Sequence, residues 1–372
     1  MQHFARTDEQ RLLAQNLTRL LSETSPIERA KAAAVPAGKS ALWGSFAELG
    51  ILGAAFNEEL GGFAGDARTI AVVMAEIGSG LVLEPYLDSA VVAGRVLESC
   101  ADEAYRSEAI QEIIAGSIYI VAHSIERPLT ARRDGDGVLL SGKAACVRHG
   151  AAADVLLAMA VGDEGSPGFF AVPRDTRGLE LTGYRLIDGA YGADIAFKDV
   201  RVPRAARLSL AASATSVLEN ALEWGLMASV AETTGILSEL NAATFAYLTS
   251  RKQFGVVLGS FQALQHRAAD MHIAGEESVA IADACVDVFA GGTREARSAL
   301  ICAAKVMADG AAKRIGAEAV QLHGGMGVSE ELIVSHYARR LVAIRHSHGS
   351  TDARRLSFGS PTPRAVTAGS PA

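Results

Sequence analysis

Two segments in the C-terminal third combine glycines with side chains that can bind anions or aromatic rings. In the first, Arg251 precedes Phe254 by three residues, and Gly255 and Gly259 follow. A guanidinium can hold a pyrophosphate by charge-assisted hydrogen bonds, and a phenyl ring can stack on an adenine. The spacing predicts that Arg251 and Phe254 share one helix face before the chain opens into a loop. The alternative is an ordinary helix end capped by glycine.

The second segment follows about 70 residues later. Gln321 is followed by three glycines, Gly324, Gly325 and Gly327. These glycines should end a helix and expose backbone amides, and a new helix near Glu330 would present its positive end to an anion. A plain turn between two helices is the alternative interpretation.

The bulk composition limits the classes of function. The chain has 372 residues, of which 49% are hydrophobic, so two or three globular domains are expected. A net charge of −7 and the lack of any Lys/Arg-rich run argue against a nucleic-acid partner. No apolar stretch reaches the length of about 18 residues expected of a membrane span, and the charged start does not resemble a signal peptide.

The four cysteines are isolated and form no CxxC pair. This pattern predicts buried thiols in a reducing cytoplasm rather than disulfides or a metal site. The four are Cys100, Cys146, Cys285 and Cys302.

Hydrophobic periodicity divides the chain into three regions and a tail. Residues 1–116 show helical spacing, 117–208 show short apolar runs bounded by Gly, Pro or Asp, and 209–358 return to long Ala-rich helical stretches. We therefore predict an α+β protein with an N-terminal helical domain, a middle antiparallel β domain and a C-terminal four-helix bundle. The Pro/Ser/Ala-rich tail, 359–372, is predicted to be disordered. The expected helices are 12–21, 41–52, 67–77, 103–114, 217–250, 262–289, 294–322 and 330–345, and the expected strands are 117–122, 137–140, 155–160 and 168–172.

Two glycine-rich loops interrupt these elements. Residues 133–137 (RDGDG) are a strong signal for a β-hairpin between the first two expected strands. Residues 57–65 (NEELGGFAG) predict a turn that needs positive φ, and a loop that faces a ligand is the alternative.

Together, the RxxFG segment at Arg251 and the QxxGGxG segment at Gln321 resemble the acyl-CoA dehydrogenase family. The resemblance extends to about residue 358 and includes LGILGAAFNEELGGFAG at 49–65. Within that family, the chain is most similar to the small subunit of the bacterial pimeloyl-CoA dehydrogenase type.

The resemblance implies FAD as cofactor and an acyl-CoA thioester as substrate. In the family, a base removes the α-proton of the thioester while a hydride leaves the β-carbon for the flavin. The residues that match Arg251, Phe254, Gln321 and Gly325 contact the FAD of a neighbouring subunit. The chain is therefore expected in an oligomer, because each flavin pocket is built from two chains.

The usual catalytic glutamate is missing from its expected position. Many members carry it in a Tyr-Glu-Gly-Thr segment 27 residues after the glutamine, where this chain has His348, followed by Gly349 and Ser350. His348 is a candidate base because the pKa of histidine lies near neutrality, and the alternative is loss of the base. His346 is no better placed. Ser350 is a candidate for cofactor binding.

Other members place the glutamate on the first bundle helix, about 26 residues before the RxxFG arginine. That position is Gly225 here, and Glu223 lies two residues away. Two residues are about half a helical turn, so Glu223 is a base only if the helix is offset. Its alternative role is a solvated or interface carboxylate.

The β region also departs from the family. Relatives carry a Thr-Glu-Pro-Gly-Ala-Gly-Ser-Asp stretch and a Trp-Ile-Thr segment against the flavin. This chain has residues 122–135 without those glycines and 143–147 (KAACV) without the tryptophan and threonine. Ser124 remains a candidate hydrogen-bond donor to the flavin.

The residues that serve the chain's own flavin are thus reduced, while those lent to a neighbour are present. This asymmetry suggests a partner-dependent subunit, in an α2β2 assembly with a second, catalytically complete chain. A self-sufficient homo-oligomer, a flavin monooxygenase of the same fold using His348 or His346, and a flavin-free structural subunit are the alternatives.

Overall fold

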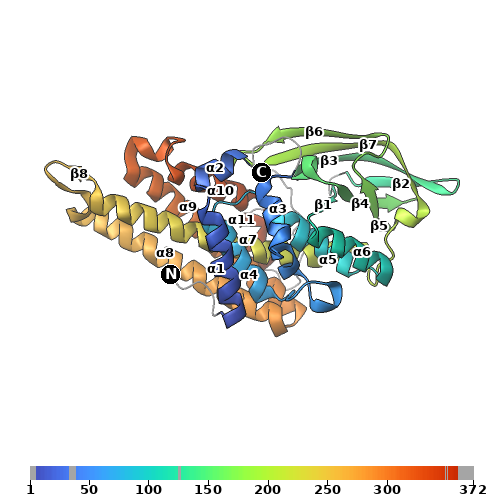
Figure 1. The fold of residues 1–372 in the computed structure, drawn as a ribbon, viewed down its shortest axis with the longest axis horizontal. Helices are drawn as coiled ribbons and strands as arrows, with labels where there is room; N and C mark the ends of the chain where they lie inside the picture. Colours follow the sequence, from blue (N-terminus) through green and yellow to red (C-terminus); the bar gives the residue numbers. More distant parts are fainter. Residues whose placement is uncertain (1–5, 33–38, 125–126, 348, 350, 359–372) are drawn as a thin grey trace. The chain divides into compact units, whose positions relative to one another are not determined.

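The structure is a computed structural model that describes residues 6–32, 39–124, 127–347, 349 and 351–358 (Figure 1). The chain forms two compact units, each built from separate stretches of sequence. The helical unit comprises Met1–Lys31, Ala67–Leu83 and Leu226–Ala372, and the sheet unit comprises Ala32–Asp66 and Glu84–Gly225. The predicted domain limits at 116/117 and 208/209 stay a prediction. The predicted tail, 359–372, lies outside the described residues.

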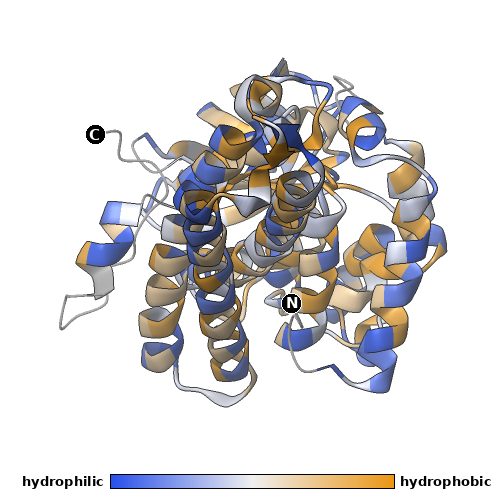
Figure 2. Cartoon of the chain, turned by 90° about the vertical axis from the view of Figure 1, so that its left-hand side faces the viewer, coloured by the Kyte–Doolittle hydropathy of each residue, from blue (hydrophilic) through white to orange (hydrophobic). Residues whose placement is uncertain are grey.

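The helical unit contains the expected long helices. This confirms that the N-terminal and C-terminal regions of the chain are helical. Its longest member, α7, begins within the sheet unit. Figure 2 shows hydrophilic and hydrophobic residues alternating around these helices. The elements are α1 (Asp8–Ser22), α2 (Pro26–Ala32), α4 (Ala67–Ser79), α7 (Ala214–Ser250), β8 (Lys252–Gln253), β9 (Val256–Val257), η6 (Leu258–Ser260), α8 (Gln262–Gly291), α9 (Arg294–His323), η7 (Gly324–Val328), α10 (Ile333–His346) and α11 (Thr351–Phe358).

Helix α1 shows how local sequence sets an element of this unit. Thr7 accepts a hydrogen bond from the Gln10 backbone N–H, and the Gln10 side chain accepts one from the Thr7 backbone, which is a capping box. Ala14, Leu17 and Leu21 follow at helical spacing and are buried. The helix therefore starts at its cap and packs through one apolar face.

Glycines let α4 and α7 cross at backbone contact. A Cβ on Gly78 would lie 2.1 Å from the carbonyl oxygen of Glu232, and a Cβ on Gly235 would lie 2.0 Å from that of Ala75. Neither distance is possible for a larger residue, so both positions require glycine. Tyr337 of α10 also donates a hydrogen bond to the carbonyl of Ser79, at the end of α4.

The sheet unit contains short helices and a seven-stranded sheet. One helix, η3, has π-type hydrogen bonding, which is rare and which the hydrophobic pattern did not predict. The elements are α3 (Ala41–Glu48), η1 (Ile51–Ala55), η2 (Glu58–Leu60), η3 (Tyr86–Ala93), α5 (Gly94–Glu98), α6 (Glu103–Ile114), β1 (Tyr119–Ala122), β2 (Leu129–Asp134), β3 (Gly137–Arg148), η4 (Gly150–Ala152), β4 (Val155–Gly162), β5 (Pro167–Pro173), β6 (Leu179–Arg185), β7 (Tyr191–Pro203) and η5 (Arg204–Ala206).

The sheet has the order β1-β4-β2-β3-β7-β6, with β5 paired to β4. The predicted hairpin turn at 133–137 is confirmed, with Asp134 opposite Gly137 and Gly135 at φ +60°. Its first strand is corrected, because the turn joins β3 to β2, which was not predicted, whereas the expected strand at 117–122 is β1 and pairs with β4. The expectation of a purely antiparallel sheet is corrected, because β4 pairs parallel with both β1 and β2. Parallel pairs need a crossover, so no local turn signal announces them.

The loop at 57–65 has the predicted positive φ angles, at Gly61 (+85°) and Gly65 (+74°). It also lines a cavity of about 480 Å³ in the sheet unit, together with Arg95, Glu98 and Arg106. The positive φ angles confirm the predicted turn, and the alternative that the loop faces a ligand stays a prediction. No helix in the described part of the chain is long and apolar enough to span a membrane.

Candidate functional site

The RxxFG segment forms a small hairpin at the end of α7. The helix ends at Ser250, and β8 and β9 are joined by a two-residue turn of Phe254 (φ +54°) and Gly255 (φ +81°). Positive φ at both turn residues suits the right-handed twist of a hairpin. The prediction that Arg251 and Phe254 share a helix face is therefore wrong, because the chain leaves the helix before Arg251.

Phe254 is held in an unfavourable conformation and left in solvent. Its side chain is 89% exposed, and its ring meets Phe261 edge-on at 6.3 Å between centroids. A left-handed conformation is uncommon for a bulky residue and is found at functional sites. The hairpin thus leaves an aromatic ring exposed at the surface.

Backbone hydrogen bonds fix Arg251 at the base of the hairpin. Its N–H donates to Tyr247 O at 2.9 Å, and its carbonyl accepts from Leu258 N at 2.8 Å. The side chain is exposed, and no acceptor for its guanidinium is recorded among the residues that the structure describes. The guanidinium is therefore available to an anionic ligand.

The glycines after Gln321 have different structural roles. Gly324 ends α9 with φ +62° and donates from its N–H to the Gln321 carbonyl. A Cβ on Gly327 would lie 2.3 Å from the carbonyl oxygen of Val320, so this position requires glycine for packing. A Cβ on Gly325 would meet no atom within 4 Å in the described part of the chain. Of the three glycines, Gly325 alone is not required by packing or by a positive φ in the described part of the chain. Its missing side chain leaves room for a ligand or another chain to approach the backbone closely.

A ring contact brings the two predicted cofactor segments to one end of the helical unit. Tyr247 of α7 lies against His323 of α9, with 4.4 Å between ring centroids and 30° between planes. His323 is buried, and its Nδ1 lies 2.8 Å from Ala319 O, so this nitrogen carries the proton and donates. Helix α10 begins at Ile333, three residues later than the expected start near Glu330.

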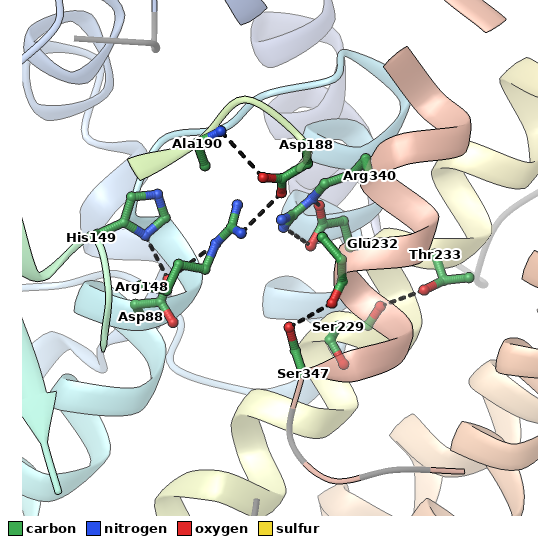
Figure 3. Close-up of polar contacts among 11 residues, drawn as sticks. Asp88, Arg148, His149, Asp188, Ala190, Ser229, Glu232, Thr233, Arg340 and Ser347 are labelled. Carbon is green, nitrogen blue, oxygen red and sulfur yellow. Dashed lines mark hydrogen bonds and ion pairs between the residues drawn. The ribbon is translucent and has the colours of Figure 1, made fainter. Parts of the chain in front are cut away.

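The buried carboxylate of α7 is Glu232, which the sequence interpretation missed. Arg340 of α10 donates to both of its oxygens, from Nε at 2.6 Å and from Nη2 at 2.8 Å (Figure 3). Glu232 lies seven residues, or about two turns, after Gly225, so the two residues share a helix face. Because both oxygens accept from the guanidinium, Glu232 is poorly suited to take a proton from a substrate. The sequence signal for this ion pair was an acidic residue in the interior of the expected helix at 217–250.

A second buried ion pair lies on α9. Lys305 Nζ donates to Asp309 Oδ1 at 2.8 Å and to Ile344 O, in the last turn of α10, also at 2.8 Å. Asp309 Oδ2 accepts from the hydroxyl of Thr351, the first residue of α11, at 2.7 Å. Burial lowers the pKa of Lys305. The pair thus ties the end of α10 and the start of α11 to α9. The candidates His348 and Ser350 lie outside the described residues.

The sheet unit has its own buried charged cluster, also missed from the sequence. His149 Nδ1 donates to Asp88 Oδ2 at 2.7 Å, and Arg148 Nη1 donates to Asp188 Oδ2 at 2.9 Å (Figure 3). His149 has φ +56°, at the end of β3, and Asp88 lies on the π-helix η3. The cluster directly follows the segment 143–147 that departs from the family pattern. The Arg-His pair was its only local signal.

Ser124 and Glu223 both belong to the sheet unit. Ser124 is half-buried after β1, and its hydroxyl accepts from Arg127 N at 3.4 Å. The neighbouring His123 has a buried Nδ1 without a hydrogen-bond partner in the described residues, and burial lowers its pKa. Glu223 is half-buried on α7. The orphaned imidazole nitrogen is a polar group that a bound cofactor can satisfy.

The residues present fit the cofactor that the motifs imply. An exposed guanidinium, an exposed phenyl ring and a glycine with free space suit a dinucleotide at the end of the helical unit. Within the described ranges, no group of three or more His, Cys, Asp or Glu residues could hold a metal ion.

Family models match both the N-terminal and the C-terminal regions of the chain. The family model for the N-terminal domain of acyl-CoA dehydrogenases matches residues 7–117, and that for the C-terminal domain matches 214–359. A probable acyl-CoA dehydrogenase of Bacillus subtilis, YngJ, is 27% identical over 332 residues, which cover 83% of this chain and 86% of the relative.

Solved structures share the fold over nearly the whole chain. The glutaryl-CoA dehydrogenase of Mycobacterium smegmatis, in complex with FADH2, superposes with a TM-score of 0.88 at 22% identity, covering 97% of this chain and 96% of that one. The ChsE4–ChsE5 complex of Mycobacterium tuberculosis contains a chain that superposes with a TM-score of 0.86 at 23% identity, covering 97% of this chain and 100% of that one. The predicted fold class is confirmed.

Proposed function

The chain belongs to the acyl-CoA dehydrogenase family, and we propose that it is a subunit of an FAD-dependent enzyme that dehydrogenates an acyl-CoA thioester. The observation that carries the proposal is the meeting of the two cofactor segments at one end of the helical unit. There the side chains of Arg251 and Phe254 are exposed, and no acceptor holds the Arg251 guanidinium within the described chain.

In this proposal, Arg251, Phe254, Gln321 and Gly325 hold the FAD of a neighbouring chain. The guanidinium of Arg251 binds the pyrophosphate through charge-assisted hydrogen bonds, and the Phe254 ring stacks on the adenine. The amide of Gln321 donates or accepts at the nucleotide, and the missing Cβ of Gly325 allows close approach. Bound FAD supplies the acceptor for the hydride that leaves the β-carbon of the thioester.

The proton at the α-carbon needs a base, and this chain offers few. Glu232 is committed to Arg340, and Glu223 lies away from the position that the family pattern indicates. His348 is the remaining candidate within the C-terminal segment. We therefore favour a subunit that depends on a second chain for the base, in an α2β2 assembly. The similarity to a chain of the ChsE4–ChsE5 complex, whose two chains have different names, supports this arrangement.

The same resemblance motivates the finer parts of the proposal. We propose a small-subunit role of the pimeloyl-CoA dehydrogenase type, because the RxxFG and QxxGG segments are present whereas the usual glutamate and the β-region motifs are missing. A cytoplasmic location is proposed because three of the four cysteines are buried thiols that form no disulfide in the described part of the chain.

The test is flavin stoichiometry in purified assemblies. The chain is produced alone and together with the product of a neighbouring dehydrogenase gene, and flavin absorbance is compared with the mass of each assembly. Arg251→Ala should release flavin from the complex. Arg355→Ala is the matched control, because Arg355 is an exposed arginine of α11 paired with Asp352.

Each outcome has a distinct meaning. A homotetramer with one FAD per chain contradicts the α2β2 arrangement, and a complex without flavin indicates a structural subunit. Oxygen consumption with externally supplied reduced flavin indicates a monooxygenase. Retention of flavin by the Arg251→Ala complex refutes the assigned role of Arg251.

A further inference from the structure

A pocket between α1 and α4 of the helical unit has a composition that the proposed function does not use. Its volume is about 440 Å³, and its walls include the side chains of Arg6, Arg11, Arg19 and Glu76. Three guanidinium groups face one carboxylate, so the lining carries a net charge of about +2 in a chain whose net charge is −7. The pocket is thus a local positive site on an acidic protein.

The acceptors in this pocket are already engaged. Glu76 Oε1 accepts from Arg6 Nη2 at 2.9 Å, and its Oε2 accepts from the hydroxyl of Thr18 at 3.0 Å. Glu239 of α7 does not line the pocket, and burial, followed by the charge of Glu76, raises the pKa of Glu239. No carboxylate oxygen of the lining therefore remains to neutralise a further arginine.

Donors, in contrast, are left over. Arg6 Nε is buried and has no acceptor in the described part of the chain. The exposed side chains of Arg19 and Gln15, both on the pocket face of α1, also have no recorded partner among the described residues. Arg11 is engaged, because it donates to the Arg6 carbonyl at 2.8 Å and pairs with Asp8. A buried donor without an acceptor is costly, so the site gains from a ligand rich in acceptors.

We propose that this pocket binds a phosphate group, either free or as the phosphomonoester of a small molecule, through Arg6, Arg19 and Gln15. Glu76 pairs with Arg6 and Asp8 with Arg11, so among the described residues of the lining Arg19 carries the unpaired positive charge. Phosphate fits better than a carboxylate because it has more oxygens to accept from these separate donors. The phosphate oxygens can accept from two guanidinium groups and an amide together, and guanidinium pairs with phosphate in a bidentate geometry. Glu76 holds Arg6 through Nη2 and is itself fixed by the hydroxyl of Thr18, which leaves Arg6 Nε for the ligand.

The test is phosphate binding by the full-length chain, measured by isothermal titration calorimetry at constant ionic strength in a buffer free of multivalent anions. Inorganic phosphate is one ligand and 3′-AMP the other, so that free phosphate and a phosphomonoester are compared. Tighter binding of either one identifies the source while supporting the site. Arg19→Ala should weaken binding by about tenfold or more, because a charge-assisted pair is lost.

Two further variants make the result specific. Arg19→Lys should recover part of the affinity by restoring the charge without the bidentate geometry. Arg355→Ala, which changes an exposed arginine outside the pocket, should bind as the unchanged protein does. Circular dichroism spectra confirm that each variant is folded. The proposal is overturned if phosphate fails to saturate at about 10 mM, well above the millimolar affinity of a weak site, or if Arg19→Ala binds as tightly as the parent.

Discussion

Replacing Lys305 by methionine is expected to destabilise the helical unit strongly. The Lys305 side chain is 1% exposed and that of Asp309 is 4% exposed, with 2.8 Å between Nζ and Oδ1. The variant leaves the Asp309 carboxylate buried without its cation, and removing one partner of a buried pair costs about 3–5 kcal/mol. At about 2–4 °C per kcal/mol for a unit of this size, Tm should fall by roughly 6–20 °C.

A double variant separates the missing charge from lost packing. Lys305→Met with Asp309→Leu removes both charges, so most of the lost stability should return, less about 1 kcal/mol for the hydrogen bond from Thr351. The free energy of unfolding is measured in urea by circular dichroism, and Tm by calorimetry. Lys313→Met is the control, because Lys313 is an exposed lysine on the same helix. A loss below about 1 kcal/mol for Lys305→Met, or a double variant less stable than the single one, would refute the reasoning.

The pH dependence of the same comparison has a defined sign. Burial lowers the pKa of Lys305, so the unfolded chain binds this proton more tightly than the folded one. The contribution of Lys305 to stability therefore increases with pH between its folded pKa and the value of about 10.4 for an unfolded lysine. The stability difference between the parent and Lys305→Met should grow with pH in that range, and a difference that shrinks would contradict the assignment.

Two more predictions follow from the glycines and the thiols. Gly327→Ala should lower the free energy of unfolding in urea by about 1–3 kcal/mol, because its Cβ meets a backbone carbonyl. Gly325→Ala should change that free energy by less than about 0.5 kcal/mol yet weaken flavin retention by the assembly. Equal losses of stability in the two variants would refute this distinction. A disulfide reagent at pH 8 should label exposed Cys146 rapidly and Cys100 slowly, since Cys100 is buried and burial raises its pKa to about 11; rapid labelling of Cys100 in the folded protein would contradict its burial.

The elements with strong local signals were predictable. Helix α6 runs from Glu103 to Ile114, as its apolar spacing indicated, and the β2–β3 turn lies where the RDGDG segment placed it. The hairpin at Phe254 was not predicted, because a Phe-Gly turn lacks the usual Asn-Gly or Asp-Gly signal and the spacing from Arg251 also suits a helix. Cys146 was expected to be buried, but it lies exposed with φ +52° beside a register shift between β3 and β7.

The sequence by itself determined the family and the order of helical and sheet regions, because periodicity and glycine motifs are recorded within short stretches of chain. It also placed Arg251 and Gln321 in segments that could bind a dinucleotide. Only the tertiary structure showed that the rings of Tyr247 and His323 are in contact, which places the two segments near one another. It also showed that Glu232 is bound by the guanidinium of Arg340, 108 residues away. Such contacts depend on how distant helices pack, so they leave no periodic signal along the chain.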